Sequence, residues 1–148
     1  AGLDDLLAAW GRIPSDRAFL RAMHFFREND RVKEAQKAME EGRTDRLLRL
    51  LNESGHSSWE WLQNCYCPED CKGQKVALAL ALTRLFLDRI GDGACRVHGG
   101  GFAGVILCVL PLEAEDAYVD YMAGFMGREN IFPMEIRQIG AVKLPLEK

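Results

Sequence analysis

The sequence predicts an α+β domain in which helices pack on a small, mainly antiparallel sheet. Three observations lead to this fold class. Apolar residues recur at helical spacing through most of the chain up to Ile90. Two short β-prone segments, Ala94 to His98 and Val105 to Leu110, flank a glycine-rich turn. An amphipathic helix from Glu113 to Met126 and a final strand from Glu135 to Val142 complete the order of elements.

Length and charge restrict the class of protein. The chain has 148 residues and a formal net charge of −3. This length suits one domain, so residues 1–148 are expected to fold as a single unit. The charge favours neither nucleic acid nor an anionic membrane as a partner. The longest apolar runs, 76–82 and 105–110, are too short to span a bilayer, and the first residues do not resemble a secretory signal. No starting Met is present, so we expect a piece of a longer chain.

Capping residues and glycines predict where the first helices begin and end. A short helix from Leu3 to Trp10 is expected to stop at Gly11. Ser15 is the candidate N-cap of a long helix over 17–41. Thr44 is expected to cap the next helix.

A break is predicted over Glu53 to His56, where Ser and Gly interrupt the apolar pattern. Ser57 and Glu60 then match a capping box. Pro68 suits the first turn of a helix that runs to Ile90 and is buried on most sides.

The glycine-rich turn is the candidate functional feature. Four of the six residues from Gly99 to Gly104 are glycine, and they fit the string G-x-G-x-x-G. A dinucleotide site needs a helix directly after this string, but the run that follows is β-prone. A protein-kinase site needs a strand lysine and catalytic aspartates downstream, and the sequence after Gly104 lacks them. A tight turn without a ligand and a phosphate-binding turn both remain open at this point.

Three of the five cysteines cluster at Cys65, Cys67 and Cys71. A structural zinc site needs four ligands in regularly spaced pairs, and this cluster offers three thiols at irregular spacing. The spacing therefore favours reduced, structural cysteines in a cytosolic protein, with no metal.

The residues from Gly93 to Gly104, Gly-Ala-Cys-Arg-Val-His-Gly-Gly-Gly-Phe-Ala-Gly, resemble the third signature motif of the GHMP small-molecule kinases in its galactokinase form. Residues 21–32 look like the galactokinase helix that carries a His followed by Glu-Asn-x-Arg, and 52–58 are similar to its Glu-Ser-His-x-Ser segment. The resemblance extends from about Asp16 to the end of the chain. His98 departs from the usual Thr or Ser, and Ala103 departs from the commoner Gly.

The resemblance implies the C-terminal half of a galactokinase-like sugar 1-kinase, with a ferredoxin-like arrangement of its sheet. The intact, cytoplasmic enzyme would transfer the γ-phosphate of ATP, with Mg²⁺, to galactose or a related hexose. The family's first two motifs and its catalytic Asp do not occur in these residues, so ATP, Mg²⁺ and sugar would be held mainly by an N-terminal domain that is absent here. We therefore expect no catalytic residue and no metal ligand in the chain, which alone would be inactive. The resemblance places six residues at the substrate and phosphate cleft: His98, Gly99, Gly100, Gly101, Phe102 and Gly104.

Two other functions share the same pattern. One is a non-catalytic sensor that binds sugar and ATP with the same fold, and the other is a kinase for a different small hydroxyl substrate, such as an N-acetylhexosamine. For Arg96, an ion-paired or solvated side chain is favoured over a contact with the cleft. Glu28, Asn29 and Arg31 are expected to form a structural polar network on their helix.

Overall fold

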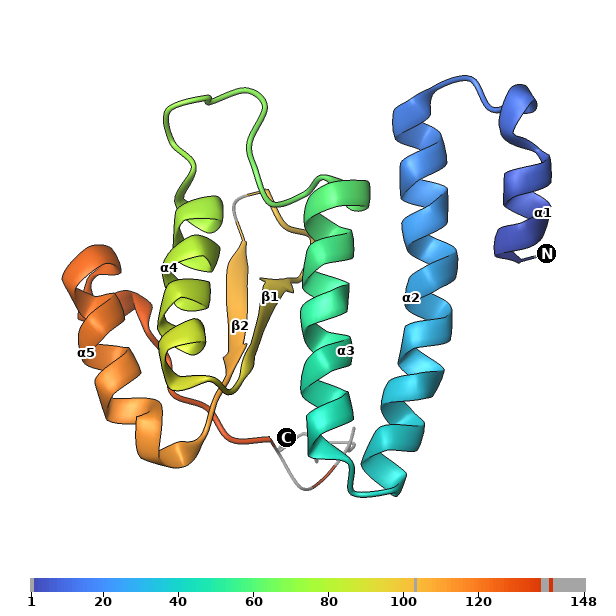
Figure 1. The fold of residues 1–148 in the computed structure, drawn as a ribbon. Helices are drawn as coiled ribbons and strands as arrows, with labels where there is room; N and C mark the ends of the chain where they lie inside the picture. Colours follow the sequence, from blue (N-terminus) through green and yellow to red (C-terminus); the bar gives the residue numbers. More distant parts are fainter. Residues whose placement is uncertain (1, 103, 137–138, 140–148) are drawn as a thin grey trace, which may run out of the picture.

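The computed structural model describes residues 2–102, 104–136 and 139 of the chain. It confirms an α+β fold with helices around a small antiparallel sheet (Figure 1). The helices are α1 (Leu3–Ala8), α2 (Asp16–Glu40), α3 (Thr44–Ser57), α4 (Lys75–Ile90) and α5 (Glu115–Met126), and the strands are β1 (Ala94–His98) and β2 (Val105–Val109). Short helical turns occupy Trp10–Arg12, Ser58–Leu62, Leu112–Ala114 and Arg128–Asn130.

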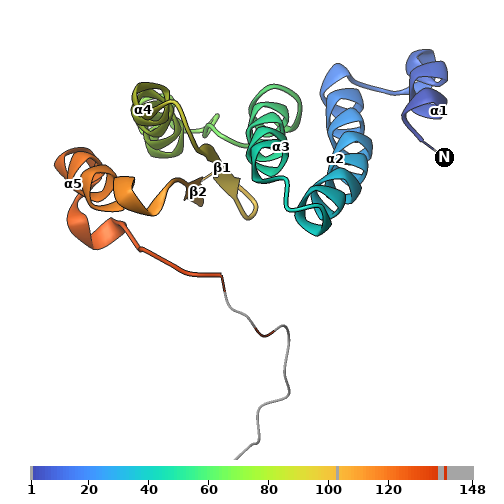
Figure 2. The ribbon, with the colours of Figure 1, turned by 60° about the horizontal axis from the view of Figure 1, so that its bottom comes forward.

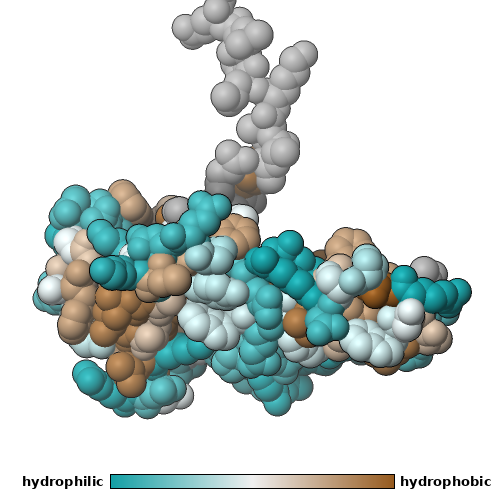
Figure 3. All heavy atoms as spheres, turned by 90° about the horizontal axis from the view of Figure 1, so that it is seen from above, coloured by the Kyte–Doolittle hydropathy of each residue, from teal (hydrophilic) through white to brown (hydrophobic). Residues whose placement is uncertain are grey.

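The elements lie side by side in an extended row. α1, α2 and α3 follow one another on one side of the β1–β2 hairpin, and α4 and α5 lie on the other side (Figures 1 and 2). Seen from above, apolar side chains gather over the α4–α5 side, whereas hydrophilic ones predominate over α2 and α3 (Figure 3). The main core cluster lies between α4, α5 and the hairpin, and it includes Leu80, Phe86, Val97, Tyr118 and Met122.

The hairpin has a regular antiparallel register, with Cys95 opposite Cys108 and Val97 opposite Ile106. These four residues belong to the core cluster or pack against it, because alternate residues of a strand share one face. Within this core, the Thr83 Oγ1 and Tyr118 Oη atoms are 2.7 Å apart and form a hydrogen bond. Both polar atoms are therefore satisfied although both residues are buried.

The long second helix begins as the sequence predicts. Ser15 has an extended backbone, and its Oγ accepts a hydrogen bond from the N–H of Ala18 at 3.1 Å. The prediction that Thr44 caps the next helix is wrong, because α3 begins at Thr44 itself and Arg43 occupies the N-cap position. The Arg43 side chain binds the Asp45 carboxylate through Nε and Nη2, each at 3.0 Å.

The predicted break over Glu53 to His56 is also wrong, because α3 runs through it to Ser57. The reason is tertiary. Gly55 is buried where α3 crosses β1, and a Cβ at this position would lie 2.7 Å from the Cys95 carbonyl oxygen. This glycine permits close packing of the helix on the strand and does not end the helix.

Two further predicted boundaries differ from the structure. Ser57 does not cap a new helix, since it closes α3 and is followed by one π-helical turn, Ser58–Leu62. Pro68 lies in a loop, and α4 begins only at Lys75. The loop is closed instead by Gln74, whose side chain accepts from the Cys67 N–H at 3.0 Å and donates to the Cys67 carbonyl at 2.8 Å. The sequence alone does not show that the Gln74 hydrogen bonds outweigh the preference of proline for the first turn of a helix.

α4 is buried on one face only. Val76, Leu80, Leu82, Thr83, Phe86 and Leu87 are buried, whereas Leu78 and Leu85 are about half exposed. The prediction of burial on most sides is therefore wrong for the described residues. The end of α4 is as predicted, because Gly91 stops the helix in the left-handed conformation with φ of 72°.

The amphipathic helix after the hairpin is confirmed as α5, preceded by the turn Leu112–Ala114. The predicted final strand over 135–142 falls mostly outside the described residues. Residues 135, 136 and 139, which are described, are not in a strand. No described helix is both long enough and apolar enough to cross a membrane.

Candidate functional site

The glycine-rich turn lies at the end of β1 and leads directly into β2, as the sequence predicts. Its backbone is left-handed at three positions, with φ of 74° at Gly99, 79° at Gly101 and 59° at Phe102. Glycine adopts this conformation without penalty, whereas Phe102 is a non-glycine residue for which it is unusual. Contacts from outside the turn must therefore hold Phe102 in place.

Asn64, in the loop before α4, supplies these contacts. The Phe102 N–H donates to the Asn64 backbone oxygen at 2.6 Å, and the Asn64 Nδ2 donates to the Gly100 carbonyl at 3.2 Å. A Cβ at Gly101 would overlap the backbone oxygen and side chain of Asn64. Asn64 is buried, and so Gly101 is required by the packing of the turn on this residue.

Gly99 and Gly100 have different surroundings from Gly101. No described atom lies within 4 Å of a Cβ built at either position, and both residues are exposed. Gly99 still has a left-handed φ, but Gly100 has neither a left-handed φ nor a neighbour that excludes a side chain. Among the described residues, the backbone N–H groups of Gly99, Gly100 and Gly101 do not take part in the hydrogen bonds that fix the turn. A group from outside this chain can therefore come close to the outer side of the turn.

The residues around these glycines differ in exposure. His98 ends β1 opposite Val105 and is exposed, Phe102 is 41% exposed, and Gly104 closes the turn through an N–H bond to the Gly101 carbonyl at 3.2 Å. The structure thus brings the six predicted cleft residues together in one turn.

Arg96 points away from the turn and into a polar network between α2, α3 and β1. Its Nη1 lies 3.7 Å from the Glu28 Oε2, and its Nε donates to the Val97 carbonyl at 3.0 Å. The predicted ion-paired Arg96 is confirmed. Arg31, which is buried, also pairs with Glu28, and the Ser54 Oγ donates to the Glu28 carboxylate at 2.6 Å.

The network confirms that Glu28 and Arg31 interact on their helix. Asn29 is exposed and does not join it. The network connects α2 to α3 and β1, so its charged side chains stabilise the packing of these three elements. Arg31 Nε is buried without a hydrogen bond, although the Glu53 carboxylate lies 3.7 Å away.

His24 extends this network toward the top of α3. Its Nδ1 lies 2.9 Å from the Ser57 Oγ, and the two atoms form a hydrogen bond. Burial lowers the pKa of His24, and the nearby Arg31 and Arg96 lower it further, against the opposing effect of the bond to Ser57. Ser57 therefore links α3 to α2 and does not begin a new helix.

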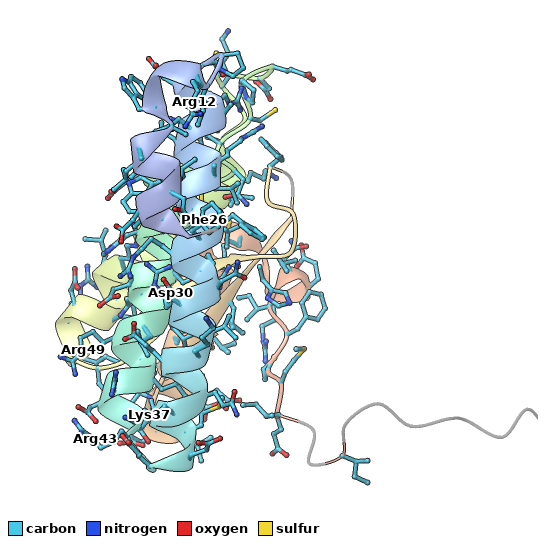
Figure 4. All side chains as sticks on the ribbon, turned by 90° about the vertical axis from the view of Figure 1, so that its right-hand side faces the viewer. Arg12, Phe26, Asp30, Lys37, Arg43 and Arg49 are labelled. Atoms are coloured by element: carbon cyan, nitrogen blue, oxygen red, sulfur yellow. The ribbon has the colours of Figure 1, made fainter. Side chains whose placement is uncertain are left out.

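Other basic residues lie far from the glycine turn. Lys37 and Arg43 are at the lower end of the α2–α3 pair, and Arg12 is at the upper end of the α1–α2 layer (Figure 4). The lower end is opposite the end of α3 next to the glycine turn (Figure 1). The hydrogen bond from Arg43 lowers the pKa of the exposed Asp45 carboxyl to about 2. Lys37 and Arg43 form exposed surface pairs with Glu41 and Asp45, and they do not add charge to the turn.

A cavity of about 470 Å³ lies at the other end of β1, between α3 and α4. It is lined by Asn52, His56, Arg84, Leu87, Asp88, Gly91, Asp92 and Gly93. Asn52 closes its inner wall by pairing with the free edge of β1: its Nδ2 donates to the Gly93 carbonyl, and its Oδ1 accepts from the Cys95 N–H, both at 3.1 Å. The side chain thus replaces a neighbouring strand at this point.

The described residues contain no group of three or more His, Cys, Asp or Glu side chains that could hold a metal ion. The predicted cysteine cluster is spread over different environments, with Cys65 buried, Cys67 half-buried and Cys71 exposed. Burial raises the pKa of the Cys65 thiol. Cysteines 65, 67 and 71 are free thiols in the structure.

Sequence reasoning missed Asn52 and Asn64. Each acts through a contact far along the chain, 43 positions from Cys95 for Asn52 and 36 positions from Gly100 for Asn64. Asn52 lies within residues 52–58, which resemble the galactokinase segment, and this resemblance could have drawn attention to it. Asn64 had no comparable signal.

Comparison with known proteins relates part of this chain to sugar kinases. No protein-family model matches the sequence. The chain is 31% identical over 103 residues to a galactokinase of Glaesserella parasuis serovar 5 (strain SH0165), which covers 70% of this chain and 24% of that protein. It is 31% identical over 97 residues to a galactokinase of Pasteurella multocida (strain Pm70), covering 66% of this chain and 23% of that protein. The chain thus spans about a quarter of the length of the curated galactokinases that it matches, and its relationship to them is distant and partial.

Proposed function

We propose that this chain is the C-terminal domain of a galactokinase-like sugar 1-kinase of the GHMP family, and that its glycine turn forms one wall of the phosphate cleft. The observation that carries the proposal is Gly100. Neither the backbone conformation of Gly100 nor any described neighbour requires a glycine at this position, and the residue is exposed. A group from outside the chain that comes close to the backbone would explain the glycine. The similarity to two galactokinases supplies the class of group that would approach it.

The chemistry of phosphoryl transfer suits such a turn. In transfer from ATP, catalysis consists mainly of positioning the reactants and stabilising charge on the phosphoryl oxygens. Backbone N–H groups that converge in a turn bind anionic oxygens, and a position without a side chain lets the phosphate come close to the backbone. The N–H groups of Gly99, Gly100 and Gly101 are the donors that this chain offers.

The remaining residues would hold the turn in shape. Asn64 fixes Phe102 and the Gly100 carbonyl from behind, which leaves the outer side of the turn for the ligand. ATP, Mg²⁺ and the sugar would be bound mainly by an N-terminal domain of the same protein, which would also provide the catalytic base. Mg²⁺ bound there would offset the negative charge of the phosphates during transfer. We expect no catalytic activity from the present residues alone.

The test uses the full-length gene product with ATP, Mg²⁺ and a panel of hexoses that includes galactose and N-acetylhexosamines. We expect phosphorylation at the anomeric hydroxyl of galactose or a related hexose. A protein that binds a hexose and ATP but phosphorylates no member of the panel would contradict the enzyme proposal and support the sensor. Phosphorylation of an N-acetylhexosamine alone would instead redefine the substrate.

Gly100→Val tests the turn itself. The structure has room for the side chain, so the free energy of unfolding should stay close to that of the wild type. The kcat should fall by about 100-fold, because the valine side chain would keep the phosphate away from the backbone N–H groups, with an effect like the loss of one anion-binding donor. Gly124→Val is a matched control. A Cβ at Gly124 of α5 also meets no described atom within 4 Å, and this position is remote from the turn in sequence. Equal losses of stability and activity in Gly100→Val would favour a turn without a ligand.

A further inference from the structure

The cavity between α3 and α4 is polar and carries charges of both signs. Its volume of about 470 Å³ is in the range of small-molecule binding sites. Such sites are usually lined mainly by apolar side chains, whereas among the described residues that line this cavity only Leu87 has a large apolar side chain. The lining residues include His56, Arg84 and the carboxylates of Asp88 and Asp92. The cavity is therefore suited to a polar ligand.

The charges are separated along the cavity. α3 and α4 run in opposite directions, so His56, near the end of α3, lies toward the same end of the cavity as Arg84 (Figure 1). Asp88 is one turn further along α4, about 6 Å by the helical rise, and Asp92 follows the end of this helix. The carbonyl groups that end α4 add partial negative charge beside these carboxylates. One end of the cavity is thus positive, and the other end is negative.

The charge of Arg84 is not neutralised within the described part of the chain, where no ion pair joins Arg84 to Asp88 or to another carboxylate. Burial raises the pKa of the Cys95 thiol beside Arg84, so this thiol is uncharged and does not balance the guanidinium. Arg84 is half-buried, and its Nη2 atom is buried without a hydrogen-bond partner among the described residues. Because an unpaired buried donor is costly, Arg84 would be stabilised by an anionic group that enters the cavity.

The two carboxylates favour the opposite charge. Asp88 is exposed, and Asp92 is bound only by its neighbour among the described residues, since its Oδ1 accepts from the Gly93 N–H at 2.7 Å. An anion alone would be repelled by these carboxylates, and a cation alone would be repelled by Arg84. A molecule that carries both charges can pair with each end of the cavity.

We propose that this cavity binds a small zwitterion with one carboxylate and one ammonium group, the chemistry of a free α-amino acid. The carboxylate would pair with Arg84, since a guanidinium binds carboxylates through two parallel hydrogen bonds. The ammonium group would lie at the end formed by Asp88, Asp92 and the last carbonyl groups of α4. The cavity and the glycine turn lie at opposite ends of β1, so this proposal does not depend on the proposed kinase function.

Isothermal titration calorimetry of the full-length protein tests the proposal. Each of the common L-amino acids is titrated separately, without ATP or sugar. We expect at least one of them to bind with a Kd below about 1 mM. Its N-acetyl derivative lacks the ammonium group, and its amide derivative lacks the carboxylate. Each derivative should bind at least about tenfold more weakly, because one end of the cavity loses its charged partner.

Two variants test whether the binding occurs in this cavity. Arg84→Gln should weaken the binding of the amino acid at least about tenfold, because it removes the partner of the carboxylate. Asp88→Asn should weaken it about threefold, because Asp92 remains at the negative end. Arg17→Gln and Asp120→Asn are the matched controls, since both positions are exposed and neither lines the cavity. Both controls should bind as the wild type does, and circular dichroism verifies the folding of all four variants.

Three results would overturn the proposal. The first is that no amino acid binds. The second is that either derivative binds as tightly as the amino acid, which would indicate a site for a single charge. The third is unchanged binding to Arg84→Gln, or an equal loss in Arg17→Gln. The derivatives are tested on the wild-type protein, so the second result is decisive even if Arg84→Gln does not fold. Sugar phosphorylation is measured on the same samples, and a protein that binds the amino acid but phosphorylates no hexose would contradict only the proposed function.

Discussion

Asn52→Ala tests whether one side chain on α3 replaces a strand at the edge of β1. The change removes both hydrogen bonds of Asn52, to the Gly93 carbonyl and from the Cys95 N–H, each 3.1 Å long. Cys95 is 1% exposed, so its N–H would be left buried without a partner, at a cost of about 1–3 kcal/mol.

The second bond is worth less. Gly93 is half-buried and lines the open cavity, so water can replace the lost donor at its carbonyl. Losing this bond should cost about 0.5–1 kcal/mol. The expected loss for Asn52→Ala is therefore about 1.5–4 kcal/mol in the free energy of unfolding.

Urea denaturation followed by far-UV circular dichroism measures this loss. Asn29→Ala is the control, because Asn29 is an exposed asparagine of α2 outside the polar network. Its stability should change by less than about 0.5 kcal/mol. If Asn52→Ala loses no more than this control, then the Asn52 side chain does not act as a substitute strand, and the account of the β1 edge is wrong.

Two further predictions concern pH and cysteine reactivity. Burial, with Arg31 and Arg96 nearby, lowers the pKa of His24 below the 6.5 of an unfolded histidine, so the unfolded chain binds this proton more readily. The stabilising contribution of neutral His24 should be fully present above pH 6.5 and should be lost as the pH falls below 6.5 toward the lowered pKa. Denaturation at a series of pH values checks this; His24→Gln should flatten the dependence, and an unchanged slope would contradict it. Alkylation of the native protein should modify the exposed Cys71 and the half-buried Cys67, and should spare Cys65, Cys95 and Cys108. Burial raises the pKa of the Cys108 thiol to about 12, which suppresses its reactive thiolate. Mass spectrometry of tryptic peptides would refute this if Cys95 were labelled as fast as Cys71.

Features set by neighbours in the sequence were predictable. The Ser15 cap, the end of α4 at Gly91 and the two strands of the hairpin each depend on residues within a few positions of one another. The glycine turn was also found, since no longer-range information is needed to recognise successive glycines between two β-prone runs.

Features set by distant contacts were not predictable. Gly55 has the same local pattern as a helix breaker, but it lies inside α3 because the backbone of β1 passes directly beside it. Pro68 has the local pattern of a helix start, but its segment is closed by the Gln74 side chain into a loop. In both cases a tertiary or side-chain contact is stronger than the local preference.

The α+β class, the hairpin and the position of the glycine turn can be predicted from the sequence alone, because periodicity, caps and glycines act locally. The differences among the four glycines depend on contacts that form only in the folded chain. Gly101 is required by the packing of Asn64, whereas Gly100 has no such neighbour among the described residues and remains open on the outer side. The tertiary structure also decided that Arg96 points into the network with Glu28, since that pairing joins residues from two elements far apart in the chain. In each case a local pattern fixes the backbone preference of a segment, and the neighbour that packs against the segment fixes its role.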